Sequence, residues 1–337
     1  MKMPDILNIL KKLTETVSVS GDENKIADII RKMTKEYADE ASVDALGNLI
    51  VTKKSKKSGA KKVMVAAHMD EIGFVATFVA DSGFVKLSPV GGIDWTAAAY
   101  GEVLFSNGVR GLVVPEDKVK PNDFKADKFY IDIGAKDKED AQSKIKVGDT
   151  CTLAPRLVKL LNNRIAASKL DDKIACAILV HTLMQLKDVP HNGELYFAFT
   201  AQEEVGLRGA RTAAQAIMPD YAIAVDVTDT GDTPECTPMA IKLGGGAAIK
   251  LMDRSAICHR EMVNLLMKTA KERGIAYQSE IMVAGGTDTA AMQSAGLGSI
   301  AGAISVPTRY IHTGVEMCDM GDVQSCADLL GEVLKKL

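Results

Sequence analysis

Predicted strands alternate with predicted helices over most of this chain, and a single stretch of about ninety residues breaks the alternation. Alternation of this kind predicts a mixed, mainly parallel sheet with helices packed on both faces, the α/β class. We expect its strands at residues 63–67, 194–200, 221–227 and 299–305. We expect helices at residues 5–14, 26–33, 173–186, 209–218, 260–273, 285–295 and 322–337, with a hairpin at 43–51.

The interrupting stretch consists of short β-like runs separated by Gly and Pro, for example at 101–106, 111–114 and 129–133. This texture predicts a small all-β barrel. The first strand of the sheet precedes the barrel, and the other strands follow residue 160, so we expect the barrel as an insertion. The predicted organisation is an α/β domain made of residues 1–71 and 161–337, with the inserted barrel at 72–160.

Composition excludes several classes of protein. The 337 residues are 47% apolar and 25% charged, which is typical of a folded globular chain. A net charge of −3 gives no electrostatic basis for binding nucleic acid. The opening segment lacks a signal-peptide pattern, and no apolar run reaches the roughly 20 residues that span a bilayer. Six cysteines without a CxxC pair indicate reduced thiols in a cytoplasmic protein.

Histidines and carboxylates follow the predicted strands where those strands end. Open α/β sheets bind their ligands at the carboxyl ends of their strands. Imidazole and carboxylate groups are ligands for divalent metal ions, and this set has enough oxygens for two ions. The sequence therefore predicts a metal site at this rim. The candidate residues are His68, Asp70, Asp171, Asp172, Glu203, Glu204, Asp226 and His312.

These side chains also suggest roles. Asp171, at the start of a helix, suits a carboxylate that bridges two ions, although the Asp171-Asp172 pair could equally be a helix N-cap. Asp70 lies two residues after His68, where it could accept the second imidazole N–H. Of the adjacent Glu203 and Glu204, one can bind metal while the other acts as general base.

Other polar features have simpler interpretations. His181 falls within a buried helix and His191 lies beside a proline in a loop, so neither is expected to be a ligand. The lysines of residues 53–62 could bind an anion, but a solvated loop is the expected state. Cys258 is adjacent to His259, but neighbours in sequence usually point apart, so a cysteine nucleophile is not expected.

Several sequence motifs resemble those of a known family. The chain is similar to the TET-type (tetrahedral) dinuclear metalloaminopeptidases, peptidase family 42 of the metallo class, from its first helix to its last. The strings QEEVGLRGA (202–210) and HMDEIGF (68–74) are the most specific. The other motifs, in the family's order, are SGDE (20–23), LDDK (170–173), AVDVT (224–228), GGTD (285–288) and RYIH (309–312).

The resemblance implies a zinc-peptidase-like domain carrying two divalent ions per chain, with Zn or Co expected and Mn as a further option. His68, Asp171 and Asp226 would bind one ion, and Asp171, Glu204 and His312 the other. Glu203 would be the general base and acid, and Asp70 would orient His68. The inserted barrel would be a dimerisation domain, and dimers would assemble into a tetrahedral dodecamer. Lys173 departs from the family's more frequent Arg, which places a bidentate contact there in doubt.

The expected activity is hydrolysis of the N-terminal bond of short peptides by a water that two metals activate and Glu203 deprotonates. A related dinuclear deacylase or carboxypeptidase is the nearest alternative. A glycosidase also uses paired carboxylates, but one Trp and 5% aromatic residues offer few surfaces for sugar stacking. The presence of Glu203 argues against a non-catalytic binding scaffold. The preferred N-terminal residue does not follow from the sequence.

Overall fold

The computed structural model describes residues 5–337 of the chain. Residues 1–4, part of the opening segment discussed above, lie outside the described residues. Two amphipathic helices come first, α1 (Ile6–Thr14) and α2 (Asn24–Thr34). The side chain of Asp5 caps α1 by accepting the N–H of Asn8 at 2.8 Å. Among the described residues, no helix combines the length and apolar character needed to cross a membrane.

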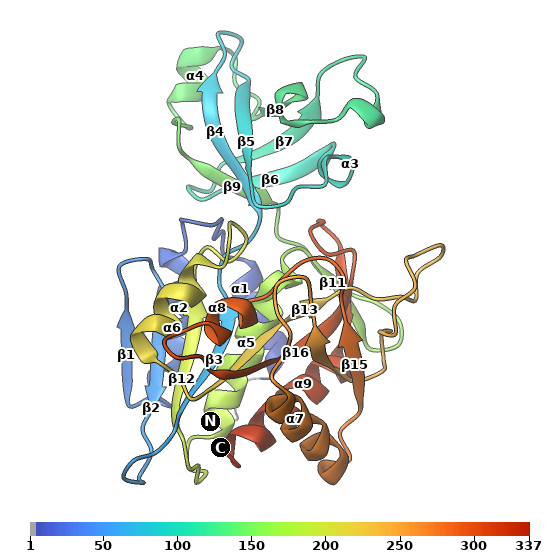
Figure 1. Ribbon diagram of the computed structural model, residues 1–337. Helices are drawn as coiled ribbons and strands as arrows, with labels where there is room; N and C mark the ends of the chain where they lie inside the picture. Colours follow the sequence, from blue (N-terminus) through green and yellow to red (C-terminus); the bar gives the residue numbers. More distant parts are fainter. Residues whose placement is uncertain (1–4) are drawn as a thin grey trace.

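Eleven strands of the described chain form one large mixed sheet (Figure 1). Its backbone order is β1-β2-β12-β3-β13-β16-β17-β11-β10, and β14 and β15 branch from β16. The strands are β1 (Glu40–Val43), β2 (Leu49–Lys53), β3 (Lys62–His68), β10 (Leu157–Lys159), β11 (Arg164–Ala167), β12 (Glu194–Thr200), β13 (Tyr221–Thr228), β14 (Ala247–Met252), β15 (Tyr277–Ile281), β16 (Ile300–Arg309) and β17 (Glu316–Asp319).

The centre of the sheet is parallel, as the alternating pattern predicts. Strands β12, β3, β13 and β16 run in the same direction, whereas β2 and β17 join them antiparallel. The last residues of β12 and β3, Thr200 and His68, are direct partners. The chain segments that leave these strands therefore begin at one common edge of the sheet, which is where the sequence places its ligands.

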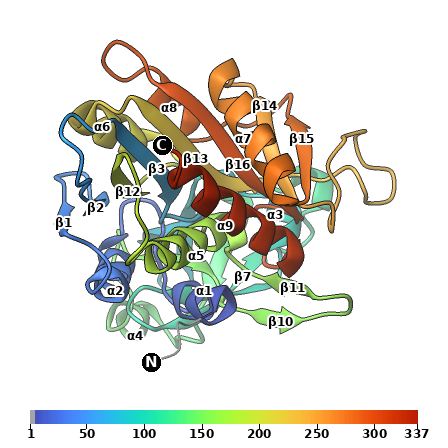
Figure 2. The same cartoon turned by 90° about the horizontal axis from the view of Figure 1, so that it is seen from below.

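Helices cover both faces of the sheet, and alternate strand residues separate the two layers. Val63, Val65 and Ala67 of β3 belong to a core shared with α1, α5 (Leu170–Gln185) and α9 (Met320–Leu334). Met64 and Ala66 face the other way, toward α6 (Arg208–Ile217) and α8 (Thr289–Gln293). Figure 2 shows these two layers on opposite sides of β3 and β13.

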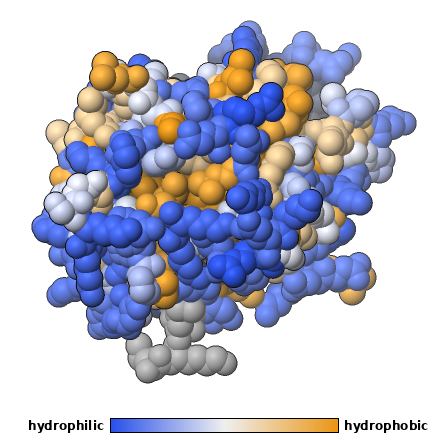
Figure 3. Space-filling view, turned by 60° about the horizontal axis from the view of Figure 1, so that its bottom comes forward, coloured by the Kyte–Doolittle hydropathy of each residue, from blue (hydrophilic) through white to orange (hydrophobic). Residues whose placement is uncertain are grey.

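The residues of α5 from Leu170 to Met184 are all buried, because the helix lies between the sheet and α1, α2 and α9. The predicted helix at 173–186 is therefore confirmed, because Asp171 and Asp172 have non-helical backbone angles and the regular turns of α5 begin after them. Helix α7 (Arg260–Arg273) packs beside β14 and β16. Seen from the end opposite the barrel, the surface is mainly hydrophilic, with apolar side chains gathered near its middle (Figure 3).

Between β3 and β10 the chain forms a closed six-stranded antiparallel barrel with its own apolar core (Figure 1). Trp95 packs against Phe74 and Phe129 in that core. The strand order is β4-β5-β8-β7-β6-β9. The elements are β4 (Gly73–Val79), β5 (Val85–Val90), α3 (Trp95–Ala98), β6 (Gly101–Phe105), β7 (Arg110–Pro115), the 3-10 turns η1 (Pro121–Asp123) and η2 (Ala126–Lys128), β8 (Phe129–Asp132), α4 (Lys138–Gln142) and β9 (Thr150–Leu153).

The hairpin and one helix differ from the sequence-based expectation. The hairpin β1–β2 joins the main sheet, because β2 pairs antiparallel with β12, so β3 is not the first strand of the sheet. The helix expected at 285–295 is confined to Thr289–Gln293. Gly285 has a positive φ of 73°, which ordinary helical backbone does not adopt, so the segment before α8 is a loop.

Candidate metal centre

Asp171 lies between two histidines, and each of its carboxylate oxygens faces one of them. Its Oδ1 is 3.0 Å from Nε2 of His68, and its Oδ2 is 3.4 Å from Nε2 of His312. Asp171 precedes the regular part of α5, with non-helical angles of φ −73° and ψ 109°, and its peptide bond to Asp172 is cis. One carboxylate is thus placed to serve two ligand groups.

The predicted ligand residues gather into two groups that share Asp171. His68, Asp171 and Asp226 form one group, and Asp171, Glu204 and His312 form the other, with the potential ligand atoms of each group within 4.8 Å of one another. Nε2 of His68 is 4.0 Å from Asp226 Oδ1, and Nε2 of His312 is 3.2 Å from Glu204 Oε2. Both groups line a cavity of about 660 Å³.

The sheet and its flanking segments deliver these side chains. His68 ends β3, and Asp226 lies on the neighbouring β13. Glu204 follows β12, and His312 follows β16 in the left-handed region at φ 64°. Parallel pairing brings these strand ends together, so residues far apart in sequence meet at one edge.

Glu203 also lines the cavity but belongs to neither ligand group. Burial raises the pKa of Glu203 well above its ordinary value, and the Asp226 carboxylate raises it further against the opposing charge of His68. For Asp171, burial also disfavours ionisation, but the imidazoles of His312 and His68 outweigh it and lower the pKa of that carboxyl. Although Glu203 and Asp171 line the same cavity, their pKa values are therefore shifted in opposite directions.

The residues fit a divalent cation on chemical grounds. Oε1 of Glu204 is buried and accepts no hydrogen bond within the described chain. Burial, and then the Asp171 carboxylate, raises the pKa of Glu204, so its charged form is costly here without a counterion. A divalent ion would satisfy the unpaired oxygen and offset the repulsion between carboxylates.

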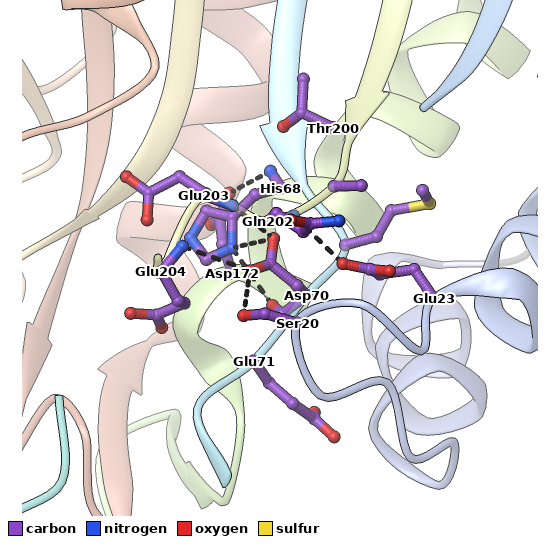
Figure 4. A network of polar contacts seen from close by, with 12 residues as sticks. Ser20, Glu23, His68, Asp70, Glu71, Asp172, Thr200, Gln202, Glu203 and Glu204 are labelled. Atoms are coloured by element: carbon purple, nitrogen blue, oxygen red, sulfur yellow. Dashed lines mark hydrogen bonds and ion pairs between the residues drawn. The ribbon is translucent and has the colours of Figure 1, made fainter. Parts of the chain in front are cut away.

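Asp70 contacts His68 differently from the expected way. Nδ1 of His68 lies 3.1 Å from the backbone carbonyl of Asp70, whereas the Asp70 carboxylate is 3.6 Å away. That carboxylate instead accepts the hydroxyl of Ser20 at 2.7 Å and the backbone N–H groups of Glu203 and Glu204 at 2.9 and 3.2 Å (Figure 4). Asp70 therefore holds the turn that presents both glutamates.

The charge of Asp70 is maintained inside this network. Burial opposes its ionisation, but the neighbouring His68 imidazole and the Ser20 hydroxyl outweigh burial and lower its pKa. In Figure 4 the side chains of Glu203 and Glu204 extend from the network on the side opposite Glu23. An ionised acceptor beneath the turn leaves both glutamate side chains free to face the cavity.

Lys173 is fully buried, and its ammonium contacts the backbone that follows His68 and not the proposed ligand side chains. Its ammonium donates to the hydroxyl of Ser18 and the carbonyl of Met69, and lies 3.4 Å from Oε2 of Glu71. Three oxygen partners match the three N–H donors of an ammonium, so these contacts do not require the planar fork of Arg. Lys173 thus fixes the backbone between His68 and Asp70.

Glu316 is a residue of the site that the sequence did not predict. Its buried carboxylate accepts the N–H of His312 at 2.9 Å and the N–H of Asp171 at 3.0 Å. The available signal was an acidic residue four positions after His312, at the start of a strand, and this pattern alone does not distinguish it from a surface carboxylate.

The barrel also reaches the site, which the sequence did not predict. A Cβ on Gly92 would lie 3.2 Å from Nδ1 of His312, and one on Gly91 would lie 3.3 Å from Cβ of Glu204. The loop after β5 therefore packs directly against two of the proposed ligands. Glycine at 92 leaves room for the imidazole.

His181, His191, Cys258 and His259 lie outside the two ligand groups, as expected. His181 is 3.0 Å from Gln185 across their side-chain nitrogens, and Nδ1 of His191 is 2.8 Å from the carbonyl of Gly193. Burial raises the pKa of the Cys258 thiol to about 12. His259 caps α7 through a 3.2 Å contact from the N–H of Glu261. The Cys258-His259 pair therefore lacks an activated thiol.

Comparisons with known proteins identify the relatives of this chain. The family model described as M42 glutamyl aminopeptidase matches residues 47–329. A putative aminopeptidase of Acetivibrio thermocellus is 46% identical and covers 99% of this chain and 100% of its own. The Pyrococcus horikoshii TET1 peptidase, described as assembling into a tetrahedron or a large octahedral shell, superposes with a TM-score of 0.90 at 32% identity, covering 99% of this chain and 100% of its own. A Thermotoga maritima structure described as an endoglucanase gives 0.83 at 29% identity, covering 97% and 96%.

A mixed sheet with histidine and carboxylate groups at its strand ends, joined to an inserted barrel, is the architecture of a metal-dependent hydrolase that acts on peptides. The chain belongs to the M42 peptidase family and is an aminopeptidase. Membership of this metallopeptidase family implies divalent metal ions.

Proposed function

We propose that this protein removes N-terminal residues from short peptides by means of two divalent ions held around Asp171. The observation that carries the proposal is the position of the Asp171 carboxylate, with one oxygen toward His68 and the other toward His312. His68, Asp171 and Asp226 would hold one ion, and Asp171, Glu204 and His312 the other. Zn and Co are the proposed metals, with Mn as the further option, because imidazole and carboxylate ligands accept all three.

Glu203 is the proposed general base. Two bound divalent ions would supply water of lowered pKa and stabilise negative charge on the carbonyl oxygen of the substrate. Glu203 lies in the same cavity without being a ligand, so its carboxylate is available to take a proton from water and return it to the leaving amine. The pKa of Glu203, raised by burial, favours proton uptake.

Asp70 is proposed to act through its neighbours. Its carboxylate fixes the backbone of Glu203 and Glu204, and its carbonyl faces Nδ1 of His68. A carbonyl acceptor at Nδ1 leaves Nε2 unprotonated and free to bind metal. Asp70 thus positions the proposed base Glu203 and the proposed ligand Glu204, and it also fixes the tautomer of the proposed ligand His68.

The test is an activity panel on metal-stripped protein. A chelator is expected to abolish hydrolysis of free-amine aminoacyl substrates, and refilling with Zn, Co or Mn to restore it, because the ligand carboxylates have few protein partners of their own. An N-acetylated peptide should resist hydrolysis, and a C-terminally amidated peptide should be cleaved. Cleavage of the acetylated peptide would instead indicate a deacylase, and a requirement for a free C-terminus would indicate a carboxypeptidase.

A glycosidase is the second candidate, because a related structure is described as an endoglucanase. Glycosidases of the two-carboxylate type require no metal. The same panel therefore includes a β-glucan substrate with and without chelator. Chelator-resistant release of sugar, with no peptide cleavage, would replace the aminopeptidase proposal.

The wall of the cavity offers charges of both signs to the N-terminal side chain of a substrate. Arg254 and Asp229 both line it, together with Met282 and the glycines 285 and 286. The panel therefore includes acidic, basic and neutral aminoacyl groups, and the ratio of their kcat/KM values measures which charge dominates.

Self-association is proposed to follow that of the relatives. The barrel, proposed as the dimerisation domain of residues 72–160, projects from one end of the α/β domain (Figure 1). It presents exposed apolar side chains such as Phe78, Phe84 and Leu112. Dimers would assemble into a tetrahedral dodecamer. The TET1 peptidase is described as forming a tetrahedron or a large octahedral shell, and a related structure is described as a dodecamer. Light scattering of the full chain tests this state.

Gly92→Ala is expected to weaken metal binding at the group that contains His312. A methyl group 3.2 Å from Nδ1 of His312 would force the imidazole to move by a few tenths of an ångström. Calorimetric titration should show a loss of several-fold in affinity for one ion. Gly314→Ala is the matched control, because its Cβ would make an ordinary 3.6 Å contact with Leu153. Equal affinities in both variants would contradict the expectation.

A further inference from the structure

Glu316 is the first residue of β17, where it pairs with Ala167 of β11, and it is only 2% exposed. Its Oε1 accepts the backbone N–H of His312 at 2.9 Å, and its Oε2 accepts the backbone N–H of Asp171 at 3.0 Å. One carboxylate therefore joins two chain segments that lie 141 positions apart, from 171 to 312.

Neither of the two N–H groups has an acceptor within regular secondary structure. Asp171 stands before the regular turns of α5, and His312 lies between β16 and β17 in the left-handed region. A buried N–H without an acceptor is costly, so each segment depends on Glu316 for its conformation.

Glu316 is not itself a member of either ligand group. Its two oxygens are directed to the two backbone N–H groups, and the side chains of Asp171 and His312 extend from there to meet at 3.4 Å. Glu316 thus affects the positions of Asp171 and His312 through their backbone N–H groups and not through their side chains. Asp70 has the equivalent relation to the backbone of Glu203 and Glu204.

We propose that Glu316 is a positioning residue that fixes Asp171 and His312 relative to each other and thereby sets the affinity of the ion they share. This inference rests on the proposed two-ion function. In this role the buried Glu316 carboxyl determines the distance between Asp171, the proposed bridging ligand, and His312 of the second ligand group. Loss of such outer partners costs about 10- to 100-fold in metal affinity in other proteins.

The decisive variant is Glu316→Gln. It keeps the size of the side chain but replaces one acceptor oxygen by an NH₂ group, which would face a backbone N–H donor. Calorimetric titration of metal-stripped protein with Co²⁺ is expected to show one ion bound about 10- to 100-fold more weakly than in the wild type. At saturating Co²⁺ most of kcat should return, because Glu316 does not touch the substrate cavity.

Asp322→Asn is the matched control. Asp322 is another buried carboxylate with both oxygens on backbone N–H groups, those of Gly244 and Gly246 at 2.7 Å each, and it lies outside both ligand groups. This variant should lose thermal stability as Glu316→Gln does, yet bind both ions with wild-type affinity. Equal losses of affinity in the two variants would show a general effect of destabilisation and overturn the proposal.

Wild-type titration separates this inference from the function on which it rests. If the wild-type chain binds fewer than two ions, the two-ion proposal fails. If the wild type binds two and Glu316→Gln binds both with unchanged affinity, the role of Glu316 fails alone. Glu316→Asp supplies the test if Glu316→Gln does not fold. It keeps a carboxyl group but is shorter by one methylene, and unchanged affinity for the ion that Asp171 and His312 share would equally overturn the proposal.

Discussion

Glu203→Gln is expected to reduce kcat by about 10²- to 10⁴-fold, the usual contribution of a general acid or base, while both metal ions stay bound. The amide fills the same volume as the carboxylate but takes up no proton. Glu203 belongs to neither ligand group, so its neutralisation removes no ligand. Its backbone N–H, which holds the turn on Asp70, is retained.

The measurement pairs kcat on a free-amine substrate with metal content per chain. Glu204→Gln is the neighbouring control, because Glu204 shares the turn but lies 3.2 Å from His312 within the second group. That variant should lose affinity for one ion. Full activity in Glu203→Gln would end its assignment as the base, and loss of an ion would reassign it as a ligand.

The candidate site could be predicted from the sequence because the ends of apolar strands can be recognised there, and parallel pairing brings those ends to one edge of the sheet. The apolar run before His68 and the run before Glu203 each end where a polar residue begins, and the register of β3 with β12 places those ends side by side. His312 is less direct, because it follows β16 by three residues in a left-handed conformation. Its place after a predicted strand made it a candidate, and its assignment to the second ligand group depended on the family resemblance.

The missed parts depend on irregular backbone that carries no periodic signal. Glu316 matters because two N–H groups lack acceptors, and that lack becomes visible only once Asp171 is seen to stand outside the helical turns. The Asp70 carboxylate faces His68 at 3.6 Å, but its contacts with the backbone of Glu203 and Glu204 were not predicted. Such contacts are set by the path of the loops, not by residue spacing.

The antiparallel additions to the sheet were also hard to predict. Strand β14 carries Lys250, whose fully buried ammonium pairs with Glu280 of β15 and lies 3.5 Å from Asp253. Polar residues inside short strands break the apolar pattern by which strands are recognised. Because β14 and β15 carry this buried ion pair, their sequences lack the apolar pattern from which a strand is predicted.

Asp171→Ala is expected to have the largest effect on metal content, because its carboxylate serves both groups. Removing it leaves His68 with Asp226 and His312 with Glu204, two ligands in each group. The chain should then lose at least one ion, with affinities reduced by more than the roughly 10- to 100-fold that loss of an outer partner costs. Peptide hydrolysis should fall to background at the same time.

The control for Asp171→Ala is Asp229→Ala, which removes a carboxylate that lines the same cavity but belongs to neither group. It should keep both ions, because only the position between His68 and His312 lets one carboxylate reach both groups. Metal analysis after exhaustive dialysis measures the ions per chain in each variant. Two tightly bound ions in Asp171→Ala would mean that the groups do not depend on a shared ligand, and the bridging role would then be wrong even if activity were lost.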